Sequence, residues 1–119
     1  FEMLVQGLGC FPDHRRPRVI WAGAADESGA LVTISEDLER VARQAGLPPE
    51  SRPFSAHLTL GRIKDRLSPE GARRLAELVG RTRSEIYGAV PVRSVELLKS
   101  ELRPTGPVYS RLATIPLTE

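Results

Sequence analysis

The stretch that most constrains this chain is His57-Leu58-Thr59-Leu60-Gly61-Arg62. Its residues favour a β-strand, in which successive side chains point to opposite faces. His57 and Thr59 then share one face, and Leu58 and Leu60 share the other, which can enter a core. An imidazole that titrates near neutrality, beside a hydroxyl about 7 Å along the strand, suits proton transfer on a phosphate. The alternative is a half-buried strand histidine bonded to a backbone carbonyl, with Thr59 serving only as a strand former.

The composition is that of a soluble globular protein. The chain has 119 residues, 40% of them hydrophobic, and a mean hydropathy of -0.22, which suits one domain or a large part of one. No apolar run approaches the length of a membrane helix, so no membrane association is expected. The lone Cys10 excludes an internal disulfide and favours a reducing compartment, which we take to be the cytoplasm.

Arginine gives the chain a basic bias, with a net charge of +2 and a pI near 9.1. Local basic clusters suit a phosphate-bearing partner, although an ordinary solvated surface explains any one of them equally well. The clusters are Arg15-Arg16-Pro17-Arg18, Arg62-Lys64-Arg66, Arg73-Arg74 and Arg81-Arg83.

Hydrophobic periodicity predicts the element order β-β-α-β-α-β-β and therefore an α+β fold. In strand 1–8, Leu4 and Leu8 are expected on one face. Thr33 and Glu36 can form a capping box for the first helix, unless that helix starts nearer Ser28. Ser68-Pro69-Glu70 predicts the start of the second helix, with a serine cap, proline in the first position and an acid in the first turn. The expected strands are 1–8, 18–23, 56–63, 90–99 and 108–115, the helices end near Gly46 and Gly80, and a slightly long loop at 103–107 joins the last two strands.

Several segments, taken together, resemble the two-histidine phosphoesterases, and more specifically the bacterial RNA 2′,3′-cyclic phosphodiesterases, once called 2′-5′ RNA ligases. The hexapeptide at 57–62 matches the second signature of that family. The other matching segments are Gly7 to Pro12 followed by Arg16 to Trp21, Arg52-Pro53-Phe54, and Ser100 to Leu102 with Gly106 to Tyr109. The resemblance covers essentially the whole chain, and the ordered set is far more specific than His-x-Thr alone.

The resemblance implies a two-lobed fold of pseudo-symmetric antiparallel sheets with helices packed outside. The family uses two His-x-Thr/Ser motifs, whereas this chain has one, because His14 is followed by Arg15 and Arg16. Residues 1–119 are therefore expected to be a single domain without its N-terminal part, whose first motif would lie upstream of Phe1. Because truncation would expose sheet edges, we expect a swapped or paired assembly.

The resemblance further implies metal-independent hydrolysis of RNA 2′,3′-cyclic phosphate ends to 2′-phosphates, with reversible 2′-5′ ligation as a related activity and no cofactor. His57 is expected to be one of two acid/base histidines, acid or base being left open, and Thr59 to bind a phosphate oxygen. Two competing hypotheses are a non-catalytic RNA- or nucleotide-binding module and an inactive fragment.

Five further residues are candidate substrate contacts. Trp21, Phe54 and Tyr109 are able to stack on a base, although core packing explains each of them too. Arg18 is able to meet an RNA backbone, or is simply solvated in its loop. Arg62 falls on the Leu58/Leu60 face of a regular strand, where it either reaches the phosphate from the strand end or pairs with a carboxylate.

Overall fold

The computed structural model describes residues 1–13 and 16–118. His14 and Arg15, the latter part of an expected basic cluster, and Glu119 lie outside the described residues. The chain divides into two compact units, Glu2–Val90 and a second unit formed by Phe1 with Pro91–Glu119. Each unit is described by itself below.

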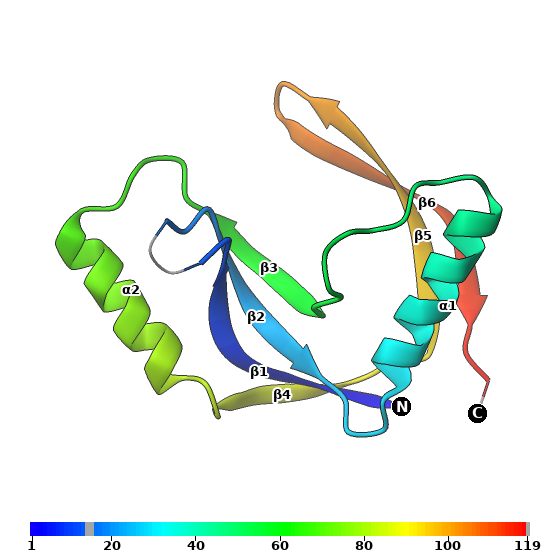
Figure 1. The fold of residues 1–119 in the computed structure, drawn as a ribbon, viewed down its shortest axis with the longest axis horizontal. Helices are drawn as coiled ribbons and strands as arrows, with labels where there is room; N and C mark the ends of the chain where they lie inside the picture. The colour runs from blue at the N-terminus through cyan, green and yellow to red at the C-terminus, as the bar shows by residue number, and fades with distance from the viewer. Residues whose placement is uncertain (14–15, 119) are drawn as a thin grey trace. The chain divides into compact units, whose positions relative to one another are not determined.

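The unit Glu2–Val90 contains a four-stranded sheet with the order β3-β2-β1-β4 and both helices (Figure 1). β1 pairs antiparallel with β2, and β2 pairs antiparallel with β3. Helix α2 packs against β1. The elements are β1 (Glu2–Phe11), β2 (Val19–Ala25), α1 (Ala30–Gln44), β3 (His57–Arg62), α2 (Pro69–Arg81) and β4 (Ile86–Pro91).

The second unit is an antiparallel hairpin of β5 (Ser94–Arg103) and β6 (Gly106–Pro116). Arg103 is paired with Gly106, so Pro104 and Thr105 alone form the loop. The loop is therefore shorter than the slightly long connection expected from 103–107. Phe1 joins this unit through two backbone bonds with Val92, one donated by the Val92 amide at 2.7 Å and one by the chain's N-terminal amine at 3.3 Å.

The α+β fold with two helices and two antiparallel sheets is confirmed, but the predicted element order is one strand short. Strand 90–99 was expected as one element. In the structure β4 ends at Pro91 and β5 begins at Ser94, and the two strands belong to different sheets. Proline lacks the amide donor that a continuing ladder needs, which is consistent with the break at Pro91.

In the four-stranded sheet, two bulges change which side chains share a face: one in β1 at Gly7 and one in β3 at Leu60. On β1, Gly7 is skipped between the pairs Gln6↔Gly23 and Leu8↔Ala22, and its φ is 70°. The Gly7 amide donates instead to the Glu85 carbonyl at 2.9 Å. Because an unpaired residue inverts the alternation beyond it, Leu4 and Leu8 lie on opposite faces. The expectation that they share a face was wrong.

The start of the first helix is bonded by Asp26, which precedes the helix, and not by a capping box. Helix α1 follows Gly29, whose φ of 78° is left-handed. The Asp26 carboxylate accepts from the amides of Ser28 at 3.0 Å and Leu31 at 3.1 Å. The start at Ala30 confirms the alternative of a start nearer Ser28, and Thr33 lies inside the helix, where its hydroxyl donates to the Gly29 carbonyl at 3.2 Å.

The second helix begins as expected. The Ser68 hydroxyl caps α2 by accepting from the Gly71 amide at 3.0 Å, and Pro69 and Glu70 occupy its first turn. The helix continues one residue past the expected stop at Gly80. The buried hydroxyl of Thr82 ends it by donating to the Leu78 carbonyl at 2.8 Å.

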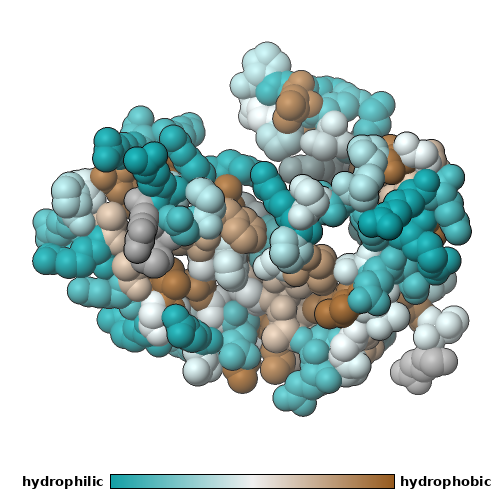
Figure 2. Space-filling model, in the orientation of Figure 1, coloured by the Kyte–Doolittle hydropathy of each residue, from teal (hydrophilic) through white to brown (hydrophobic). Residues whose placement is uncertain are grey.

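Little apolar surface is fully buried among the described residues. Ala22 is the one buried hydrophobic residue there, and neither helix has a buried residue. Leu58 and Leu60 are 44% and 61% exposed. Apolar residues accordingly reach the surface among hydrophilic ones (Figure 2). Neither described helix has the length and apolar character needed to cross a membrane.

Candidate active site

His57 begins β3 and is held through one ring nitrogen. Its Nδ1 lies 2.7 Å from the carbonyl oxygen of Ser55, and its side chain is exposed. Because a carbonyl oxygen only accepts hydrogen bonds, Nδ1 carries a proton. Nε2 is therefore the ring atom that is free to accept or donate a proton.

The register of β3 places Thr59 and Arg62 on the same face as His57. His57 is paired with Gly23, Thr59 with Trp21 and Arg62 with Val19, and Leu60 is skipped between them. Directly opposite residues of an antiparallel pair share a face, and Gly23, Trp21 and Val19 alternate along one face of β2.

The bulge at Leu60 therefore corrects the expected position of Arg62. A regular strand would place Arg62 with Leu58 on the opposite face, but the extra residue inverts the alternation. None of the carboxylates that the structure describes lies within ion-pair distance of Arg62. Its guanidinium is thus not engaged by a described acid, and it lies on the His57 face.

Three aromatic rings from three neighbouring strands meet on this face. The Phe11 ring centroid lies 4.9 Å from that of His57 at an interplanar angle of 89°, and 5.1 Å from that of Trp21 at 40°. The Trp21 and His57 centroids are 6.2 Å apart. The indole Nε1 of Trp21 is buried without a hydrogen-bond partner among the described residues.

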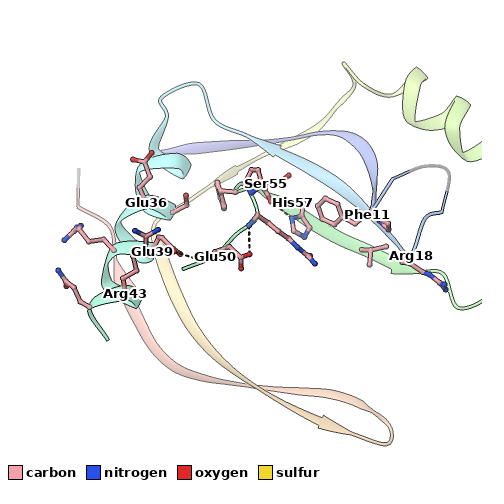
Figure 3. Close-up of a pocket in the computed structure, with 16 residues that line it drawn as sticks. Phe11, Arg18, Glu36, Glu39, Arg43, Glu50, Ser55 and His57 are labelled. Carbon is pink, nitrogen blue, oxygen red and sulfur yellow. Dashed lines mark hydrogen bonds and ion pairs between the residues drawn. The ribbon is translucent and has the colours of Figure 1, made fainter. Parts of the chain in front are cut away.

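A cavity of about 1460 Å³ lies beside His57, between the sheet and α1 (Figure 3). Its wall combines the ends of β1 and β2, one side of α1, and the segment 50–55 that leads into β3. It is lined by Phe11, Pro12, Arg18, Val19, Ser35, Glu36, Glu39, Arg40, Arg43, Gln44, Glu50, Arg52, Pro53, Phe54, Ser55 and His57.

The charges in the cavity wall fall into two groups. On α1, Arg43 pairs with Glu39 at 3.4 Å, and Arg40 pairs with Asp37 at 3.0 Å. Arg18 and Arg52 have no carboxylate within ion-pair distance among the described residues. Glu36 and Glu50 of the same wall likewise have no ion pair among the described residues, so its four arginines and three glutamates leave an excess of one positive charge, which suits an anionic ligand.

The structure brings some of the predicted residues together and leaves others apart. His57, Arg18 and Phe54 line the cavity, and Phe54 is 53% exposed there. Trp21, Thr59 and Arg62 share the His57 face without lining the cavity. Tyr109 is 63% exposed in β6, which belongs to the other unit.

Sequence reasoning gave no role to three other residues of this site: Phe11, Arg52 and Ser55. Phe11 and Arg52 lie in segments that the family resemblance had already marked, and this was an available signal. Ser55 acts through its carbonyl oxygen, which any residue carries, so its side chain gave no signal. The polar side of α1, with Glu36, Glu39 and Arg43, reads as an ordinary solvated helix face.

Among the described residues, no group of three histidine, cysteine, aspartate or glutamate side chains is placed to hold a metal ion. The polar groups on the His57 face and in the cavity wall include hydroxyl and guanidinium donors, namely Thr59 and Arg62 on that face and Arg18 and Arg52 in the wall. Such donors bind phosphate oxygens directly.

A histidine and a threonine two positions apart on a strand, beside a basic cavity in an α+β fold, define a site suited to phosphate chemistry. Residues 23–109 match the family model described as LigT like phosphoesterase. The chain belongs to this phosphoesterase family.

Two relatives and one solved structure show how far the similarity extends. The chain is 40% identical to an RNA 2′,3′-cyclic phosphodiesterase of Aeropyrum pernix over 94% of its length, and 39% identical to one of Methanothermobacter thermautotrophicus over 92%. The crystal structure of TT0787 of Thermus thermophilus covers 98% of the chain with a TM-score of 0.73 and 30% identity. The chain spans 62%, 57% and 60% of these three proteins.

Proposed function

We propose that the protein hydrolyses the 2′,3′-cyclic phosphate at RNA ends to a 2′-phosphate, with His57 as one of two acid/base groups. In this reaction a water oxygen bonds to phosphorus, the bond from phosphorus to the 3′ oxygen breaks, and that oxygen takes up a proton. One group must remove a proton from the water and the other must supply one to the leaving oxygen. A 5′-hydroxyl that attacks phosphorus in place of the water would form a 2′-5′ linkage by the same steps, and the reverse of that reaction would cleave it.

The observation that carries this proposal is that the His57 ring is exposed while its Nδ1 is bonded to the Ser55 carbonyl, whereas the alternative expects the same bond in a half-buried ring. The bond fixes the tautomer and leaves Nε2 for proton transfer, as either acid or base. The phosphodiesterase names of the two relatives support the same reaction.

The remaining candidates take roles that follow from their positions. Thr59 shares the His57 face, so its hydroxyl can donate to a phosphate oxygen that gains charge during the reaction. Arg62 lies on that face as well, and we assign it to the phosphate. Arg18 and Arg52, unpaired in the cavity wall, would meet the RNA backbone.

Base stacking is best assigned to Phe54. Its ring is exposed in the cavity wall, whereas Trp21 is half-buried among other rings. Stacking on an aromatic ring is how proteins often hold an unpaired RNA base. Tyr109 of the hairpin unit is also exposed, and we propose it as a further stacking residue for RNA.

The second acid/base group is proposed to come from a part of the protein outside these 119 residues. The relatives are longer than the chain, and His57 is the one histidine among the described residues. We therefore propose that residues 1–119 form the C-terminal part of one two-armed domain. The described chain would have little activity when isolated.

Isolated residues 1–119 are proposed to pair with a second copy, by strand exchange or edge pairing. β3 is an edge strand of the described sheet, and Leu58 and Leu60 are exposed beside it. Such an edge is a template for pairing. Size-exclusion chromatography with light scattering should show a dimer, and a compact monomer would contradict this proposal.

A reducing compartment, the cytoplasm, is the proposed location. Cys10 is the one cysteine of the chain, and partial burial raises the pKa of its thiol. A thiol with a raised pKa is a poor nucleophile for disulfide exchange.

The decisive experiment measures hydrolysis of a 2′,3′-cyclic phosphate on a short RNA by the full-length protein in the presence of a chelator. His57→Ala should lower kcat by about 10²- to 10⁴-fold, the usual contribution of a positioned acid or base. His14→Ala is the matched control, because His14 is not part of a His-x-Thr motif. Unchanged turnover in His57→Ala would refute the proposal. RNA binding without hydrolysis by the unmodified protein would favour the binding-module hypothesis instead.

A further inference from the structure

The imidazole of His57 needs a second constraint besides its bond to Ser55. That single hydrogen bond, at 2.7 Å, fixes Nδ1 but leaves the ring able to tilt about it. The side chain is exposed, and the residue of β2 that pairs with His57 is Gly23, which offers no side chain to pack against. Whatever fixes the direction of Nε2 must therefore come from elsewhere on this face.

Phe11 supplies the closest ring contact that His57 makes. The two rings meet at 4.9 Å and 89°, a T-shaped arrangement in which the edge of one ring approaches the face of the other (Figure 3). Such pairs have a preferred geometry and are stabilised beyond their buried area. The contact is thus directional, in a way that aliphatic packing is not.

Phe11 itself contacts a second aromatic ring, that of Trp21. Its ring lies 5.1 Å from that of Trp21, and the indole of Trp21 covers Gly9 of β1. Phe11 ends β1, whereas His57 begins β3, so the contact crosses the intervening strand β2. A continuous series of packing contacts therefore links Gly9 to Trp21, Trp21 to Phe11, and Phe11 to His57.

We propose that Phe11 is a positioning residue for His57, holding the imidazole so that Nε2 keeps one direction relative to the phosphate. The inference rests on the proposed function, in which Nε2 transfers a proton. Proton transfer needs a donor and acceptor within about 2.6–3.2 Å, so a tilt of the ring reduces turnover. Phe11 lines the cavity, but the proposed RNA contacts are Phe54, Arg18 and Arg52, so Phe11 should influence kcat more than KM.

The competing explanation is that Phe11 only fills space at the end of β1. Three substitutions in the full-length protein separate the two explanations. Phe11→Leu keeps an apolar side chain but removes the ring, and Phe11→Tyr keeps the ring. Tyr87→Leu is the control, because it removes a ring from β4 of the same sheet away from the cavity.

Two readouts are measured on each variant. The first is steady-state hydrolysis of a short RNA with a 2′,3′-cyclic phosphate. Phe11→Leu should lower kcat about tenfold with KM nearly unchanged, since an aromatic pair contributes energy on that scale. The second is the order parameter of the His57 ring Cε1–H bond from ¹³C NMR relaxation, which falls when the ring gains freedom to tilt. It should fall in Phe11→Leu and keep its wild-type value in Phe11→Tyr and Tyr87→Leu.

Wild-type kcat in Phe11→Leu, or an unchanged order parameter of the His57 ring, would overturn the inference. Equal losses of kcat in Phe11→Tyr and Phe11→Leu would overturn it too, because the tyrosine retains the ring. If the unmodified protein does not hydrolyse the cyclic phosphate, the proposed function fails. The order parameter of the His57 ring then still decides whether Phe11 restrains that ring.

Discussion

The indole of Trp21 occupies the space that a side chain on Gly9 would need. A Cβ built on Gly9 would overlap Cζ2 and Cη2 of the indole and lie 2.7 Å from Cε2. The φ of Gly9 is not positive, so the requirement for glycine comes from packing and not from backbone conformation. The small residue on β1 and the large one on β2 thus depend on each other.

Gly9→Ala should therefore destabilise the protein. The added methyl has to displace the indole, and overpacking of this kind costs about 1–3 kcal/mol. The free energy of unfolding, measured by urea denaturation followed by circular dichroism, should fall by that amount. Gly80→Ala is the matched control, since a Cβ at this helical position meets no atom within 4 Å. It should raise stability by about 0.4–1 kcal/mol, and equal effects at both positions would contradict the packing argument.

Arg62→Ala tests the face assignment that the bulge at Leu60 imposes. Hydrogen bonds to a charged group contribute about 1.5–3 kcal/mol, so kcat/KM for the cyclic phosphate should fall roughly 10- to 150-fold. Arg66→Ala, four residues later and outside the strand, should leave kcat/KM near the wild-type value. Similar kcat/KM values for the two variants would show that Arg62 does not reach the phosphate.

The stability of the α1 region should depend on the ionisation of Asp26. Hydrogen bonds to its carboxylate, from the Ser28 hydroxyl first and then from backbone amides, lower the pKa of Asp26 from its ordinary value of 3.8. A lowered folded-state pKa means that this stabilisation is fully present above pH 3.8 and is lost as the pH falls through the folded value. Thermal unfolding of the wild type and Asp26→Asn should converge at low pH. Parallel Tm profiles at every pH would refute this role.

Ser68→Ala should remove the N-cap of α2. The hydroxyl accepts from the Gly71 amide at 3.0 Å, and loss of such a cap costs about 1 kcal/mol. Ser68→Asp retains an acceptor and should keep most of that stability. Urea denaturation of both variants makes the comparison, and equal loss in the two would show that the hydroxyl does not act as a cap.

The sequence was sufficient for the elements that local chemistry specifies. Ser68-Pro69-Glu70 predicted the start of α2, and the alternation around His57 predicted β3. These signals lie within a few residues of the feature they specify, so no knowledge of the fold is required to read them.

Side-chain faces beyond each bulge could not be predicted. At both Gly7 and Leu60 one residue is skipped, and every later side chain changes face. A skipped residue depends on the partner strand, which a single strand's sequence does not contain. The break between β4 and β5 at residues 91–94 could not be predicted for a similar reason, because the two strands pair with partners in different sheets.

The site was only half predictable for the same reason. His57 and Thr59 are two positions apart in sequence, but Phe11, which contacts His57, lies 46 positions before it. The contribution of α1 to the cavity wall could not be predicted from the sequence either. Its charged residues differ in no local way from those of any solvated helix face.

Trp21 gives this protein an optical reporter inside its own site. It is the one tryptophan of the 119 residues, and its ring centroid lies 6.2 Å from that of His57. A protonated imidazole quenches the fluorescence of a nearby indole more strongly than a neutral one does. The fluorescence of Trp21 therefore reports the proton on His57 and the arrival of an anion beside it, without any added label.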